Sequence, residues 1–341
     1  MGRPHGAAGV NGLLMAGAVM AAGLWATGAF ATSAPAAGPN GPITSIDLPA
    51  VVGEPADRVT PPGPTIGGCP VFPTSNAWNQ DISQLPLHAR SAQMIATIQS
   101  IGGDDLHPDF GSDPDYGIPY VVVPEGQANV PITYDAYGDE SDPGPFPIPL
   151  DAPHEGGSDS HVLVVQQGSC MLYELFAASR SGNGWRADSG AKWNLNTGAL
   201  REIGWTSADA AGLPILPGLV RYDEVASGAI RHAIRVTFSR TQRGFILPAT
   251  HYASSDANPN LPAMGQRLRL SADYDISHLT GASRVIAVAM QRYGLIVADN
   301  GSNWFFQGST DPRWDDDDLN QLKRIPGTAF EVVDTGPVQT G

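Results

Sequence analysis

The sequence predicts a mainly β fold, a jelly-roll-like β-sandwich with a few accessory helices, and leaves a mixed α+β domain as the alternative. Three observations lead to this expectation. The 341 residues include 40 Gly and 30 Pro, which favour turns over long helices. Short apolar or alternating runs recur between these turn residues, a pattern typical of strands. Clear helical spacing occurs in few places, chiefly 89–100 and 285–293, and each of these ends at glycine.

The expected strands follow one another at short intervals along the chain. They are 120–123, its expected partner 131–134, 161–167, 170–176, 191–195, 230–238, 265–270, 295–298, 304–306 and 329–333. The Pro-rich stretch 141–149 has few N–H groups for a sheet, and we expect it to be an extended segment at the rim.

Two of these strands carry the most specific expectations. Gly168-Ser169 separates 161–167 from 170–176 by the length of a two-residue hairpin, which would place Leu163 opposite Glu174 and put His161 on the face of Glu174. Both faces of this hairpin are largely apolar, so we expect it to be packed on two sides. In 230–238, strict alternation places His232 on the apolar face.

The chain divides into four parts. The apolar run 13–30 follows Arg3 and ends near a small-x-small site, so 1–31 is interpreted as a signal peptide, with a retained anchor as the alternative. A Pro/Gly-rich linker, 32–68, precedes a single globular domain, 69–334, and a polar tail, 335–341. We therefore expect a secreted, extracellular protein with no membrane contact after cleavage.

Charge and cysteine content narrow the possible partners. The net charge of −15 argues against nucleic acid and anionic membranes, which need a basic surface. Two cysteines in an exported protein predict a disulfide between Cys69 and Cys170, and they are too few for an all-protein zinc site. No cofactor is expected, apart from a possible Ca²⁺ at the acidic run 315–318, whose other interpretation is a solvated helix start.

Several runs resemble a family of secreted, mostly uncharacterised bacterial proteins. They are YGDESDPGP at 137–145, WTSADAAGLPI at 205–215, 217–225, and RYGLIVADNGS at 292–302. The resemblance covers about 69–334 and implies export, but no established activity and no catalytic residues. One departure is Asn194, which stands where the family pattern suggests Asp.

No sharp catalytic motif is present: there is no nucleophile elbow, phosphate loop, dinucleotide fingerprint or H-E-x-x-H. What remains is a dispersed set of acid–base residues on strands or at their ends. They are Asp159, His161, Glu174, Asp209, His232, His251 and Asp299. Each also has an ordinary interpretation, as a buried hydrogen-bonded residue, a cap or a turn.

The leading functional hypothesis is a glycoside hydrolase that acts on an extracellular polysaccharide. That chemistry needs two carboxyl groups, and the candidates are Glu174 and Asp209, with Asp299 as substitute. The expected substrate-binding residues are His161, His232, His251, Trp193, Trp205 and Trp304. We further expect His232 to have an acidic partner, which would be Asp209 or Glu174. A polysaccharide lyase is the second enzymatic choice, and a non-catalytic polysaccharide-binding or cell-surface protein is the rival.

Overall fold

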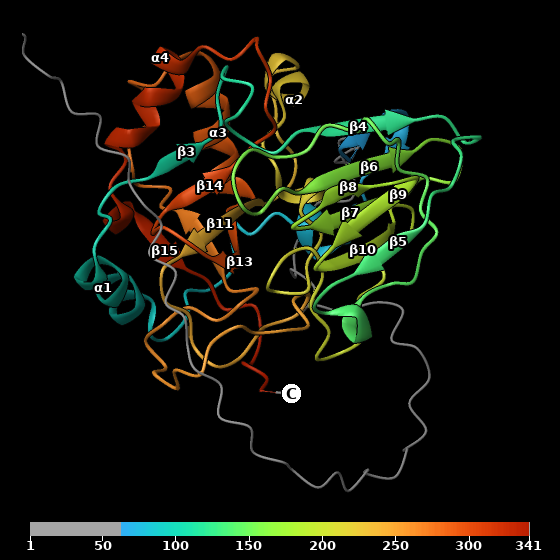
Figure 1. Ribbon diagram of the computed structural model, residues 1–341. Helices are drawn as coiled ribbons and strands as arrows, with labels where there is room; N and C mark the ends of the chain where they lie inside the picture. The colour runs from blue at the N-terminus through green and yellow to red at the C-terminus, as the bar shows by residue number, and fades with distance from the viewer. Residues whose placement is uncertain (1–62, 341) are drawn as a thin grey trace, which may run out of the picture. The chain divides into compact units, whose positions relative to one another are not determined.

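The computed structural model describes residues 63–340, and its strands lie in several sheets (Figure 1). Strands take up 25% and helices 18%, so the expected mainly β class is confirmed. The expected signal peptide and most of the expected linker lie outside the described residues. No helix between residues 63 and 340 has both the length and the apolar character needed to cross a membrane.

The largest sheet has six strands in the order β15-β12-β13-β11-β14-β3. Their bounds are β3 His107–Asp109, β11 Ile234–Phe238, β12 Arg267–Leu270, β13 Leu295–Asn300, β14 Phe305–Gln307 and β15 Phe330–Val332. The central strand β11 pairs in parallel with β13 and antiparallel with β14, while β14 pairs in parallel with β3.

A four-stranded sheet has the order β10-β7-β6-β4. Its strands are β4 Tyr120–Val123, β6 Val162–Gln166, β7 Met171–Phe176 and β10 Ser189–Asn194. The predicted hairpin register is confirmed, because Leu163 pairs with Glu174. Two smaller sheets combine β5 Ile132–Tyr134, β8 Ser179–Ser181 and β9 Gly184–Ala187, and β1 Thr65–Ile66 with β2 Cys69–Pro70.

The helices are α1 Ser91–Ile101, α2 Tyr222–Ala226, α3 Gly281–Arg292 and α4 Asp316–Leu319. Short 3-10 helices occur at Ala77–Asn79, Gly138–Glu140, Leu216–Gly218, Asn320–Arg324 and Gly327–Ala329. Both strongly periodic segments are helical, as predicted. Helix α3 ends at Arg292 with Tyr293 as its C-cap, and Gly294 follows with a φ of 70°, a conformation that glycine adopts without steric cost.

Three expectations about the sheets are wrong. The sheets do not form a clear sandwich, and four strand pairs are parallel, whereas a jelly roll is antiparallel. Strand β5 pairs with β9 and not with β4. The strand expected at 230–238 begins only at Ile234, so His232 lies on a bend before it. Both faces of β11 are buried, so alternation of apolar residues did not mark where this strand begins.

Residues 205–219, which we name the bridging segment, connect the two larger sheets through hydrogen bonds. From β7, Glu174 accepts the backbone N–H groups of Ile215 and Leu216 at 2.9–3.0 Å. From the six-stranded sheet, the Arg235 guanidinium reaches the Asp209 carboxylate at 2.9 Å. Buried backbone groups need partners, so these polar contacts satisfy a loop that lies deep in the protein.

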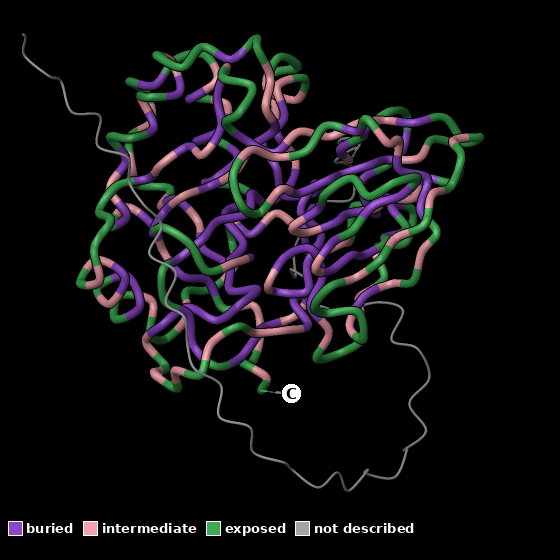
Figure 2. The backbone as a smooth tube through the Cα atoms, viewed as in Figure 1, coloured by how far each residue is buried: buried purple, intermediate pink, exposed green. Residues whose placement is uncertain are grey.

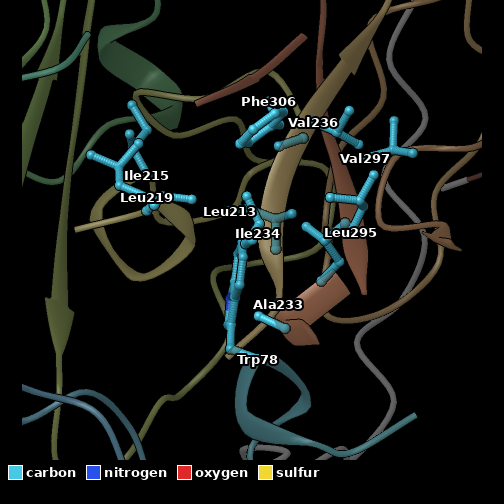
Figure 3. Packing of buried hydrophobic residues seen from close by; sticks show 14 of the residues in the cluster. Trp78, Leu213, Ile215, Leu219, Ala233, Ile234, Val236, Leu295, Val297 and Phe306 are labelled. Carbon is cyan, nitrogen blue, oxygen red and sulfur yellow. The ribbon is translucent and has the colours of Figure 1, made fainter. Parts of the chain in front are cut away.

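The core surrounds this segment, and buried residues are concentrated along the sheets (Figure 2). Figure 3 shows β11 with Leu213, Ile215 and Leu219 of the bridging segment to one side and β13 to the other. A second cluster, with Val162, Val164 and Trp185, covers the opposite face of the four-stranded sheet. The hairpin β6–β7 is therefore packed on both faces, as its sequence predicts.

The predicted disulfide joins Cys69 and Cys170 and leaves no free cysteine. It attaches β2 to the end of the β6–β7 turn. Strand β1 lies inside the expected linker, so the folded part begins earlier than Cys69. The expected tail is also attached, because Phe245 and Gln339 exchange backbone hydrogen bonds at 2.8–2.9 Å.

Removal of this crosslink is expected to destabilise the protein strongly. The bridge closes a loop with a sequence separation of 101, and a loop of this length contributes about 4–5 kcal/mol in the chain-entropy model. Urea unfolding of the Cys69→Ala/Cys170→Ala double variant should show a free energy of unfolding lower by up to this amount. An unchanged midpoint would mean that the crosslink does not restrict the unfolded chain.

Candidate functional site

A pocket of about 320 Å³ lies where the loop before β6 meets one face of the six-stranded sheet. We name it the acidic pocket, because four carboxyl groups line it. Its lining residues are Asp109, Ile118, Glu155, Asp159, His161, Arg235, Thr237, Asp299, Asn300, Gly301, Ser302, Phe305 and Gln307. Pockets of about 300–1,000 Å³ are the size that binds small molecules.

Strand pairing places three of these side chains in one row. Gln307 of β14 pairs with Asp109 of β3, and the Arg235 guanidinium donates to the Gln307 side-chain carbonyl. Thr237 pairs with Phe305 in the next row of the same face. Each strand contributes alternate residues, so a single sheet face supplies a cation, an amide, a carboxyl and an aromatic ring.

Asp299 reaches the pocket because of a break in the strand register. Val236 pairs with Val297, but Thr237 pairs with Asp299, so Ala298 is an extra residue in β13. Bulges of this kind redirect side chains and are frequent beside functional sites. Regular alternation would have put Asp299 on the buried face of Val297. The shift aligns it with Thr237 at the pocket.

The loop before β6 supplies the other wall with Glu155, Asp159 and His161. His161 Nδ1 donates to the Glu155 carboxylate, and Nε2 donates to the Ala208 carbonyl at 3.0 Å. Burial alone would lower the pKa of His161, but the hydrogen bond and the charge of Glu155 outweigh it and raise the pKa. Because both ring nitrogens face acceptors, His161 is a fixed cation here rather than a general base.

Arg235 is the second fixed cation, and it is 2% exposed. Its Nη2 donates to Asp209 Oδ1, while Nε has no hydrogen-bond partner in the part of the chain that the structure describes. Asp209 lies behind Arg235 and outside the pocket lining. Burial raises the pKa of Asp209 to about 7, with the Asp299 charge adding to the rise and Arg235 opposing it.

Two carboxyl groups of the pocket also have raised pKa values. Burial raises the pKa of Asp299, and the charge of Asp159 raises it further, against Arg235 and the Asn300 N–H. Burial likewise raises the pKa of Asp109, and the charge of Glu155 adds to this effect. Carboxyl groups whose pKa values are raised by burial and by neighbouring carboxyl groups are an arrangement that acid–base catalysis uses.

The structure brings together Asp159, His161 and Asp299 from the dispersed set that the sequence singled out. It places the expected pair Glu174 and Asp209 elsewhere. Glu174 is fully buried, and its carboxylate accepts Trp193 Nε1 at 3.2 Å as well as the two backbone N–H groups. These carboxylates hold the bridging segment, so neither is open to a substrate.

The other two histidines of the expected set, His232 and His251, form their hydrogen bonds outside the acidic pocket. His232 faces the Ala233 carbonyl at 2.7 Å and Glu224 at 3.0 Å. An acidic partner was expected, but its identity was wrong, because the bend before β11 turns His232 toward α2. His251 bonds the Ala210 carbonyl at 2.7 Å and supports the bridging segment.

The three tryptophans expected to bind sugar do not line the acidic pocket. Trp304 is fully buried against Phe238 and Phe330. Trp193 is buried beside Glu174, and the Arg201 guanidinium lies 5.6 Å from the ring centres of both Trp193 and Trp205. Trp193 and Trp304 therefore contribute to packing, which was the other interpretation of aromatic residues in this sequence, while Trp205 is half-buried beside Arg201.

Two carboxylates of the acidic run 315–318 cap helices, and a third holds a neighbouring loop. Asp315 accepts the N–H groups of Asp317 and Asp318 at the start of α4. Asp318 accepts Ala282 N at 2.6 Å at the start of α3, and Asp316 accepts Ser112 N at 2.9 Å. Within residues 63–340, no group of three or more His, Cys, Asp or Glu side chains is arranged to hold a metal ion.

Sequence reasoning missed Arg235, Asp109, Glu155 and Gln307. For Arg235 a signal existed, since it shares a face of the predicted strand with Thr237, opposite the apolar residues. Strand β3 was not predicted, so nothing placed Asp109 near Gln307. Comparisons with protein families, with curated proteins and with solved structures gave no match.

Glu174→Gln is expected to lower stability, because an amide cannot accept all of the N–H groups that the carboxylate holds. One buried group left unsatisfied costs about 1–3 kcal/mol. Urea unfolding should show this loss for Glu174→Gln, whereas Glu202→Gln at an exposed position serves as the matched control. Equal stability of the two variants would contradict a structural role for Glu174.

Asp209→Asn is expected to change how stability depends on pH. The pKa of Asp209 rises on folding from 3.8 to about 7, so its stabilising contribution is full below the lower value and is lost as pH rises to the upper one. The stability of the wild type relative to Asp209→Asn should therefore fall by more than about 1 kcal/mol over this range and then level off. Urea unfolding at several pH values measures this difference, and a constant difference would contradict the raised pKa.

Proposed function

We propose that this protein is a secreted carbohydrate-active enzyme, a glycoside hydrolase acting on an extracellular polysaccharide, with its active site in the acidic pocket. The observation that carries the proposal is the pair Asp299 and Asp159. Both line the same pocket, and the charge of one raises the pKa of the other. Glycoside hydrolysis needs two such carboxyl groups on either side of the scissile bond.

Each carboxyl group has a role that fits its surroundings. Asp299, whose raised pKa favours its protonated form, donates a proton to the glycosidic oxygen as the C–O bond breaks. Asp159 is exposed at the pocket mouth, where it takes a proton from the water that attacks the anomeric carbon. The products are a free reducing end and a free hydroxyl group, which accounts for all atoms of the water molecule.

The remaining lining residues support recognition of a sugar. Asn300 and Gln307 offer amide groups, and Phe305, stacked on His107 with ring centroids 4.0 Å apart, offers an aromatic surface. Arg235 and His161 are held by Asp209 and Glu155, so they stay in place without substrate. Groups held in advance in this way lose little freedom on binding.

Purified protein is expected to release reducing ends from at least one member of a panel of neutral, acidic and amino polysaccharides. Asp299→Asn and Asp159→Asn should each lower kcat by about 10²–10⁴-fold with little change in melting temperature. Activity should also fall on the alkaline side, because Asp299 must hold its proton. Asp151→Asn, exposed and outside the pocket lining, is the matched control.

The outcomes separate the rival functions. Absorbance from unsaturated products in place of simple hydrolysis products would indicate a lyase. Saturable binding of a polysaccharide without cleavage would indicate a binding protein. Full activity of both aspartate variants would remove the acidic pocket as the catalytic site.

A further inference from the structure

The charges of the acidic pocket do not balance, and its cations are already engaged. Arg235 is paired with Asp209, and His161 is paired with Glu155. In the described part of the chain, no Lys, Arg or His forms an ion pair with Asp109, Asp159 or Asp299. Three carboxyl groups therefore share one pocket without an ion-pair partner among residues 63–340, although the Arg235 charge opposes the rise in the pKa of Asp109 and Asp299. Asp109 and Asp299 are half-buried and Asp159 is exposed. A ligand that covers these carboxylates would remove them from water, which is costly unless a positively charged group of the ligand pairs with them.

A second observation concerns the floor of the same pocket. Arg235 lines it while being 2% exposed, and its Nε–H has no acceptor among residues 63–340. The positive charge of the Arg235 guanidinium at the pocket wall attracts an oxygen atom of the ligand. The pocket thus favours a ligand that has both an oxygen atom to contact Arg235 and a cationic group to contact the carboxyl groups.

The arrangement of the carboxyl groups distinguishes between kinds of cation. Asp109 of β3 and Asp299 at the end of β13 come from different strands of the sheet, and Asp159 comes from the loop before β6 on the other wall. No three of the acidic or histidine side chains of the described residues are grouped as metal ligands would be. Separated carboxyl groups suit an organic cation that also carries hydroxyl groups, such as an amino sugar with a free amine.

We propose that the acidic pocket binds a sugar unit carrying a free, protonated amine, and that Asp109 is the carboxyl group that receives the ammonium. Asp159 and Asp299 are used in the proposed hydrolysis, which leaves Asp109 for recognition. Asp109 belongs to the row Arg235–Gln307–Asp109, so an ammonium group at Asp109 and a sugar oxygen at Arg235 can belong to one bound unit. This inference rests on the proposed function and names the substrate class of the same site.

The test uses the full protein and four probes of matched length at a series of pH values from mildly acidic to neutral, because the pKa of Asp109 is raised and its carboxyl group must be ionised to pair with an ammonium group. The probes are tetramers of glucosamine, N-acetylglucosamine, glucose and galacturonic acid, and titration calorimetry measures their binding. The glucosamine tetramer should bind at least about tenfold more tightly than the N-acetylated one, with an affinity that falls as salt is added. The acidic tetramer should bind most weakly.

Asp109→Asn should bring the ratio of the glucosamine and N-acetylglucosamine dissociation constants close to one, whereas Asp151→Asn should keep the ratio of the wild type. The melting temperature of each variant checks its folding, and the salt dependence of the wild type tests the charge argument without any substitution. Similar affinity for the glucosamine and neutral tetramers would overturn the amine specificity and leave the hydrolase proposal standing. Tight binding of free ethanolamine or of Ca²⁺ alone would overturn recognition of an amino sugar. Absence of binding and of cleavage with every sugar would refute both proposals.

Discussion

The structure depends on the polar contacts that hold the bridging segment between two sheets. This loop is buried, and a buried loop is stable only when its backbone groups find partners. Glu174 supplies two acceptors from one sheet, and Arg235 of the other sheet reaches Asp209 within the loop. Leu213, Ile215 and Leu219 then pack against β11 (Figure 3). Buried charge and apolar packing therefore act on the same fifteen or so residues, and the loop serves as the inner layer of the core.

The same contacts create the acidic pocket. Arg235 points from β11 into the pocket because Asp209 and Gln307 hold its guanidinium group. His161 is fixed by Glu155 on one side and by the Ala208 carbonyl of the bridging segment on the other. The pocket thus has two anchored cations, and three of its carboxyl groups, Asp109, Asp159 and Asp299, form no ion pair in the described part of the chain. Such an arrangement lowers stability, and proteins retain it where binding or catalysis needs groups that are already in place.

The expectations that were right concern features decided by nearby residues, and those that were wrong concern features decided by residues far apart in the sequence. The β6–β7 register and helices α1 and α3 were predictable, since a turn length and a periodicity within about a dozen residues decide them. The start of β11 was not predictable, because both of its faces are buried, including Arg235, and the alternation of apolar and polar residues therefore does not mark its first residue. The pair Glu174 and Asp209 was a reasonable chemical choice from sequence. Their buried, hydrogen-bonded environments, and not their residue types, give both carboxylates a structural role instead of a catalytic one.

Four features could be predicted without a structure: the mainly β class, the Cys69–Cys170 pairing, the hairpin register and a set of residues that contains Asp159, His161 and Asp299. These follow from composition, from an even number of cysteines and from local patterns. Only the tertiary structure decided that Asp109 and Arg235 join them. Strands β3, β14 and β11 are far apart in sequence, and their pairing is a non-local contact that no local pattern encodes. The one-residue bulge that turns Asp299 toward the pocket likewise exists only once β11 and β13 are paired.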